Sequence, residues 1–200
     1  TGYQKVGDPQ VQEKFSKAWG VPLSDKPGLT VTKSMDAIFD GRIKGMLIMG
    51  ENPILSEANA NHAGEALERL EFLVVQDIFM TETAAYADVV LPAASYAEQL
   101  GSYTNTDRRV QLSCPAVPPP GEARADWEIL TDLAKRLGLD WSYSGSEAIF
   151  NEMASLTPSY AGMSYSRLAD EKSLQWPCPD SKHPGTPYLH VGKFSRGLGQ

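Results

Sequence analysis

Two short polar segments carry residue types suited to ligand binding, and each follows an apolar run. Gly50-Glu-Asn-Pro53 comes directly after the first run, and Gln76-Asp77 comes after the second. A glycine at such a point lets a ligand approach the backbone, and the Asn52 amide can both donate and accept hydrogen bonds. Ser56 lies near an expected helix start, where N–H groups can face a phosphate. Ordinary turns between strands and helices use the same residues, so both interpretations stay open.

The pair Gln76-Asp77 has a more specific possible role. An acidic residue after the second strand of a nucleotide-binding fold often accepts hydrogen bonds from ribose hydroxyls, and either side chain could also contact a base edge. A turn or helix cap is an equally good interpretation. Thr81 and Thr83 could likewise offer hydroxyls to a ligand or cap the helix that they open.

A second polar cluster follows further along, made of Asn105, Asp107, Arg108 and Arg109. Adjacent arginines can bind phosphate or carboxylate, but structural ion pairs are the favoured interpretation. The three histidines have no spacing to Cys, Asp or Glu that indicates a metal site or a catalytic triad. No residue is therefore predicted to be catalytic or a metal ligand.

The helices and strands expected around these polar segments predict an α/β fold. Apolar runs at 45–49, 72–75 and 88–91 predict parallel strands, and a helix from Ser56 to about Leu70 separates the first two. The runs are apolar on both faces, so we expect helices to cover both sides of a Rossmann-like sheet. The carboxyl ends of such strands form the usual ligand crevice.

The chain divides into three parts on this basis. Residues 1–113 are predicted to form the α/β domain, which opens with a helix capped by Asp8 and Gly20. Residues 114–122 form a stiff proline-rich connector. Residues 123–200 form a helical and irregular segment, with helices at 126–138 and 146–156 that Asp126 and Ser146 are predicted to cap. The stretch from Pro158 onward lacks a clear period, and we expect it to have no core of its own and to pack on other parts of a larger protein.

Composition excludes several classes of protein. A formal net charge of −7 argues against nucleic-acid binding. Cys114 and Cys178 are too far apart to form an iron–sulfur or zinc ligand set. No apolar run is long enough to span a membrane, and the first residues do not resemble a signal peptide.

Several blocks, taken together and in this order, resemble the molybdopterin oxidoreductase family. They are Leu47-Ile-Met-Gly-Glu-Asn-Pro53, Phe72-Leu-Val-Val-Gln-Asp-Ile-Phe-Met-Thr-Glu-Thr83, Ala87-Asp-Val-Val-Leu-Pro-Ala93, Gly101-Ser-Tyr-Thr-Asn-Thr-Asp-Arg-Arg109 and Asp126-Trp127. Two further blocks narrow the resemblance to formate dehydrogenase catalytic (alpha) subunits: Leu156-Thr-Pro-Ser-Tyr-Ala-Gly162 and Leu174-Gln-Trp-Pro-Cys178.

The resemblance implies a cofactor and the residues that contact it. The cofactor is a molybdopterin guanine dinucleotide, carrying molybdenum or tungsten in the whole enzyme. The implied contacts are Gly50, Glu51, Asn52, Pro53 and Ser56 after the first strand, Gln76, Asp77 and Thr81 after the second, and Asp107. Asn52 stands where some relatives have Asp, which keeps an acceptor and removes a charge.

The resemblance also implies that this chain is an internal part of a longer subunit. The iron–sulfur cluster, the metal-binding Cys or selenocysteine and the substrate-binding Arg would lie elsewhere in that subunit. Implied partners are its remaining domains, electron-transfer subunits with iron–sulfur clusters, and formate. The isolated chain is expected to be inactive and to self-associate through exposed apolar surface. Two alternatives are another molybdopterin enzyme, such as nitrate reductase, and a stand-alone nucleotide-binding or assembly module without a redox role.

Overall fold

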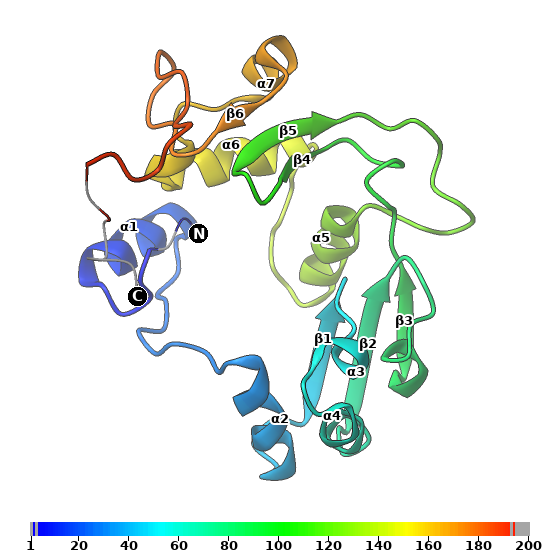
Figure 1. Ribbon diagram of the computed structural model, residues 1–200. Coiled ribbons are helices and arrows are strands. Elements are labelled where there is room, and N and C mark those ends of the chain that lie inside the picture. The colour runs from blue at the N-terminus through cyan, green and yellow to red at the C-terminus, as the bar shows by residue number, and fades with distance from the viewer. Residues whose placement is uncertain (1, 3, 193, 195–200) are drawn as a thin grey trace. The chain divides into compact units, whose positions relative to one another are not determined.

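The computed structural model describes residues 2, 4–192 and 194, which form two compact units that interleave along the chain (Figure 1). One unit comprises Lys26–Gln99 and Pro115–Ser142; we call it the parallel-sheet unit. The other comprises Thr1–Asp25, Leu100–Cys114 and Tyr143–Gln200; we call it the antiparallel-sheet unit. Within the described residues, no helix is long and apolar enough to cross a membrane.

The parallel-sheet unit is built on three neighbouring parallel strands in the order β1-β2-β3. Their bounds are Gly45–Met49, Phe72–Asp77 and Val89–Pro92, close to the predicted runs. Met49 is the register partner of Gln76, which in turn is the partner of Leu91. The predicted α/β fold with a parallel sheet is therefore confirmed, and the carboxyl ends of the strands lie side by side.

The connection from β1 to β2 differs from the single predicted helix. It contains a short helix α3 (Pro53–Ser56) and then α4 (Ala60–Leu67). Glu57 is extended between them, and the Asn59 carboxamide, rather than Ser56, caps α4 by accepting from the His62 N–H at 3.1 Å. The helix period alone could not show this break, because apolar positions continue through it.

Helices pack on one face of the sheet. Two helices, α2 (Val31–Phe39) and α4, pack against each other, and α4 contributes Leu67 to a core with Ile48, Leu73 and Val75 of the strands. Each of these four side chains is buried.

The opposite face of the sheet is contacted by a helix at its carboxyl end, as predicted, and is open elsewhere. It exposes Leu47, Met49, Phe72 and Val89, which retain between 39% and 51% of their accessible surface. Gln76 lies on this face and is fully buried, because α5 (Asp126–Arg136) contacts the sheet at its carboxyl end. Apolar residues in a short strand therefore do not by themselves show that both faces are covered.

The antiparallel-sheet unit contains strands β4, β5 and β6 and helices α1, α6 and α7. Their bounds are Gly101–Thr104, Arg109–Ser113, Leu174–Gln175, Pro9–Trp19, Ser146–Leu156 and Tyr165–Glu171. The strand order is β4-β5-β6. The predicted caps of α1 are confirmed: the Asp8 carboxylate accepts from the Gln10 N–H, and Gly20 takes a left-handed φ of 68°.

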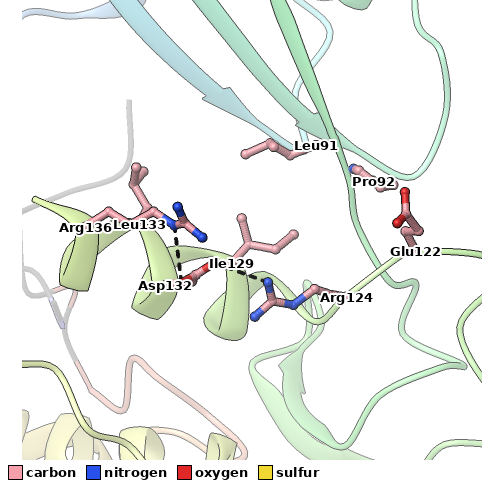
Figure 2. A pocket seen from close by; sticks show the side chains of 8 residues that line it. All are labelled: Leu91, Pro92, Glu122, Arg124, Ile129, Asp132, Leu133 and Arg136. Atoms are coloured by element: carbon pink, nitrogen blue, oxygen red, sulfur yellow. Dashed lines mark hydrogen bonds and ion pairs between the residues drawn. The ribbon is translucent and has the colours of Figure 1, made fainter.

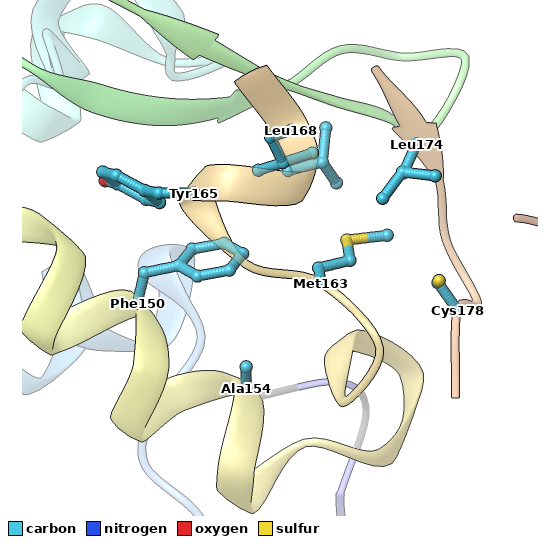
Figure 3. Close-up of a cluster of buried hydrophobic side chains, with 8 residues drawn as sticks. Phe150, Ala154, Met163, Tyr165, Leu168, Leu174 and Cys178 are labelled. Atoms are coloured by element: carbon cyan, nitrogen blue, oxygen red, sulfur yellow. The ribbon is translucent and has the colours of Figure 1, made fainter. Parts of the chain in front are cut away.

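The C-terminal stretch has a core, which contradicts the prediction that it lacks one (Figure 3). The reason is that its apolar residues come from several short elements without a common period. The buried cluster combines five residues of this stretch with one residue of β5 and two of α6: Met163, Tyr165, Leu168, Leu174 and Cys178 with Val110, Phe150 and Ala154.

Two predicted helix caps are also wrong by one residue. Asp126 and Ser146 are the first helical residues, and the capping positions are Ala125 and Gly145. The side chains are used elsewhere: the Asp126 carboxylate accepts from Gln76, and the Ser146 hydroxyl donates to the Leu100 carbonyl.

Candidate functional site

The structure brings the two polar segments together at one edge of the parallel sheet. Residues 50–56 follow β1, and residues 77–83 begin at the last residue of β2; we call them the first and second rim segments. The Gly50 N–H donates to the Gln76 carbonyl at 2.9 Å, so the segments start from adjacent points. Gly50 has a φ of 60°, and the space where a side chain would project is open. The predicted strand-end residues thus lie close together, and Gly50 leaves the backbone accessible.

Asn52 connects the two rim segments. Its side-chain oxygen accepts from the Thr83 hydroxyl at 2.7 Å and from the Thr83 N–H at 3.3 Å. Its amide nitrogen donates to the Glu82 carboxylate at 2.8 Å. The Thr83 hydroxyl oxygen also accepts from the Ile54 N–H at 3.3 Å. Asn52 is therefore engaged as both donor and acceptor within the protein.

The other predicted contact residues form local hydrogen bonds of the kind expected for turns. Ser56 donates to the Glu51 carboxylate at 2.7 Å. The Asp77 carboxylate accepts from the Phe79 N–H at 3.0 Å, and the Thr81 hydroxyl oxygen accepts from the Ala84 N–H at 3.2 Å. These bonds fix the side chains without using all the acceptor capacity of the two carboxylates.

Gln76 lies in a different environment from the rest of the site. Its side chain is fully buried, and its amide nitrogen donates to the Asp126 carboxylate at 2.6 Å. That carboxylate can only accept when ionised, so the amide must point its nitrogen toward α5. The amide oxygen is left without a hydrogen-bond partner. Gln76 therefore joins the sheet to α5 and retains an unused acceptor.

The rim is acidic. The first segment contains Glu51, the second contains Asp77 and Glu82, and neither contains Lys, Arg or His. The hydrogen bond from Asn52 lowers the pKa of Glu82 from its ordinary value, so this carboxylate is held in its charged form. Such a rim favours ligands that present hydrogen-bond donors and disfavours anions.

A hollow of about 200 Å³ lies at the carboxyl end of β3, beside α5 (Figure 2). Leu91, Ile129 and Leu133 contribute apolar surface. Asp132 lies between two arginines and forms ion pairs with Arg124 and Arg136, each at 3.4 Å. With Glu122 also on the lining, two carboxylates face the two arginines of the hollow.

Asp107 does not belong to the parallel-sheet unit. It lies in the antiparallel-sheet unit, between β4 and β5, and forms an ion pair with Arg109 at 2.9 Å. Arg108 has a φ of 64°, and its guanidinium donates to the backbone carbonyls of Trp176, Thr186 and Pro187. These contacts support the structural interpretation of the arginines.

Sequence reasoning did not identify two contributors to the site, Glu82 and Asp126. Glu82 lies next to Thr83 within the block Phe72–Thr83 that carries the family resemblance, so its position in the sequence could have indicated its role. Asp126 is separated from Gln76 by 50 positions, and no local pattern connects them. Within the part of the chain that the structure describes, no cluster of three or more His, Cys, Asp or Glu side chains could hold a metal ion.

Comparison with known proteins gives a consistent assignment. The sequence profile described as molybdopterin oxidoreductase matches residues 11–136, more than half of the chain. The F420-dependent formate dehydrogenase subunit alpha of Methanocaldococcus jannaschii is 50% identical over 196 residues, covering 96% of this chain and 28% of that protein. The assimilatory nitrate reductase catalytic subunit of Bacillus subtilis is 43% identical, covering 97% of this chain and 28% of that protein.

Among solved structures, acetylene hydratase from Pelobacter acetylenicus matches with a TM-score of 0.61 and 20% sequence identity. The match covers 95% of this chain and 30% of that one. At this identity the similarity supports the fold alone. This chain therefore spans less than a third of each of these three proteins.

Proposed function

Because the chain belongs to the molybdopterin oxidoreductase family, we propose that it is an internal part of a formate dehydrogenase catalytic subunit and that its parallel-sheet unit positions one molybdopterin guanine dinucleotide. The similarity to a formate dehydrogenase alpha subunit at 50% identity supports the first part of the proposal. The second part rests on the geometry of the rim.

The observation that carries the proposal is the acidic rim at the ends of β1 and β2. Guanine presents a ring N–H and an amino group side by side, and one carboxylate can accept from both. Ribose hydroxyls are also donors that an acidic residue after β2 can bind. Glu51, Asp77 and Glu82 supply the required acceptors, and Gly50 leaves the backbone open.

The residues at the rim therefore fit the guanosine half of the cofactor. We assign it to Gly50, Glu51, Asn52, Pro53, Ser56, Asp77 and Thr81; the predicted contact of Gln76 would require exposure of a side chain that is fully buried here. The rim segments contain no basic side chain, so the pyrophosphate and pterin would be held by other groups. We keep Asp107 as a further proposed contact, separate from this set; its carboxylate belongs to the antiparallel-sheet unit and is paired with Arg109.

In the whole subunit, the bound cofactor and its molybdenum or tungsten ion would accept two electrons as formate is oxidised to carbon dioxide, and iron–sulfur clusters held elsewhere would receive them. The residues of this chain bind and orient. The remaining domains of the subunit would supply the metal ligand and the formate site. The chain in isolation should accordingly show no formate oxidation.

Nucleotide selectivity tests the proposed site. We would titrate the 200-residue chain with GDP, IDP and ADP and follow binding by calorimetry. Inosine lacks the amino group of guanine, so the expected order of affinity is GDP, then IDP, then ADP. Asp77→Asn should weaken GDP binding about tenfold, since a charged hydrogen bond contributes about 1.5–3 kcal/mol. Equal affinities for GDP and ADP would contradict guanosine recognition.

A nitrate reductase is the second candidate, and the 43% identity to the Bacillus subtilis enzyme favours it. Assays of the complete subunit distinguish the two functions. Formate-dependent reduction of a viologen dye supports the first, whereas nitrate-dependent oxidation of the reduced dye supports the second.

A further inference from the structure

Thr83 differs from its neighbours in the second rim segment in how deeply it is buried. It is fully buried, although it belongs to a segment whose preceding residues Phe79 and Met80 are 72% and 74% exposed. Buried hydroxyls normally have a defined hydrogen-bonding role. Here the hydroxyl donates to the side-chain oxygen of Asn52 and accepts from the Ile54 N–H, so it bonds twice to the first rim segment.

The hydrogen bonds between the two rim segments use both the oxygen and the nitrogen of the Asn52 side-chain amide. The Thr83 N–H and hydroxyl both reach the Asn52 oxygen, and the Asn52 amide nitrogen reaches the Glu82 carboxylate. The amide of Asn52 is therefore fixed in orientation, because its oxygen faces two donors and its nitrogen faces a carboxylate. An Asp at position 52 would retain the acceptor and lose the donor to Glu82.

We propose that Thr83 is a positioning residue that latches the two rim segments together and so sets the spacing of the carboxylates that receive the guanosine. This role rests on the proposed function for its ligand, but the latch itself is a property of the protein. It acts through Asn52 and Glu82 and does not require Thr83 to contact the cofactor. The gain is preorganisation, since rim segments held in one arrangement lose less conformational freedom on binding.

Matched substitutions separate the hydroxyl from the space that it fills. Thr83→Val keeps the branched shape and removes both hydrogen bonds of the hydroxyl, and Thr83→Ser keeps the hydroxyl. Asn52→Ala breaks the latch from the other segment, at a half-buried position, and serves if Thr83→Val fails to fold. Thr131→Val is the control: Thr131 is a buried threonine in the same unit whose hydroxyl donates to the Trp127 carbonyl within α5.

The first readout is amide hydrogen exchange in the 200-residue chain, measured at Ile54 and at position 83. Exchange at both amides should be about tenfold faster in Thr83→Val, or at position 83 in Asn52→Ala, than in the native chain. Thr83→Ser should restore native rates, and Thr131→Val should leave them unchanged. Unchanged exchange in Thr83→Val, or equal acceleration in Thr131→Val, would overturn the latch.

The second readout is GDP affinity, which distinguishes failure of the latch from failure of the proposed function. We expect Thr83→Val to weaken GDP binding about tenfold and Thr83→Ser to restore it. Accelerated exchange without any GDP binding, even by the native chain, would support the latch and count against the guanosine site. Accelerated exchange with undiminished GDP affinity would refute the positioning role.

Discussion

The bond between Gln76 and Asp126 gives a prediction whose size follows from what each substitution leaves behind. In Asp126→Ala, the buried Gln76 amide loses its only assigned partner, so both its nitrogen and its oxygen are unsatisfied. A buried polar group left without a partner costs about 1–3 kcal/mol. Asp126 is also in the first turn of α5, where a negative charge contributes about 0.3–1 kcal/mol. The expected loss is therefore about 1–4 kcal/mol.

Gln76→Met should cost much less, although it alters the buried member of the pair. Met has a similar length and removes both the donor and the oxygen that already lacks a partner. The remaining Asp126 carboxylate is only partly buried and can be solvated. The loss of a charged hydrogen bond and the removal of an unsatisfied acceptor nearly cancel, which leaves a change within about 1 kcal/mol.

Native-state hydrogen exchange can measure the difference in stability between these two variants within the parallel-sheet unit. Leu73 and Val75 are buried in β2, so their amides report the free energy of opening the parallel-sheet unit. Glu128→Ala is the control for charge in the first turn of α5, and its partly exposed pairing with Arg124 should contribute below about 1 kcal/mol. If Asp126→Ala proves no more destabilising than Glu128→Ala, or Gln76→Met proves the worse of the pair, the reasoning is refuted.

Three further predictions concern charge, association and packing. A carboxyl NMR titration should show the pKa of Glu82 below its ordinary value in the native chain and closer to that value in Asn52→Ala. The stabilisation linked to this lowered pKa is present at neutral pH and is lost as pH falls through the lowered pKa. A titration curve of Glu82 that does not change in Asn52→Ala would contradict this prediction. Sedimentation velocity should show self-association of the native chain that is reduced when Leu47 and Met49 on the open sheet face are both changed to Lys, whereas a native monomer at all concentrations would argue against it. Leu168→Ala should destabilise the antiparallel-sheet unit by about 2–5 kcal/mol in urea unfolding, because the side chain is 1% exposed, and a loss below 1 kcal/mol would show that the core of Figure 3 collapses around the cavity.

The sequence by itself determined the local elements and their order. The apolar runs identified β1, β2 and β3, because strand formation depends on short contiguous stretches, and Asp8 with Gly20 marked α1 through capping chemistry that acts within a few residues. The polar residues at two strand ends were sufficient to predict that the segment starting at Gly50 lies beside Gln76, since neighbouring parallel strands end at the same side of the sheet. The family also followed from these local blocks in their order.

Only the tertiary structure decided which groups at that edge are engaged. Asn52 bonds to Thr83 across 31 positions, and Gln76 is buried by Asp126 across 50, and nothing in the spacing of the chain specifies either pairing. The core around Leu168 was equally beyond sequence reasoning, since burial depends on what segments distant in sequence bring together. The residue types determine which groups can donate or accept hydrogen bonds, whereas the folded chain determines which partners they have.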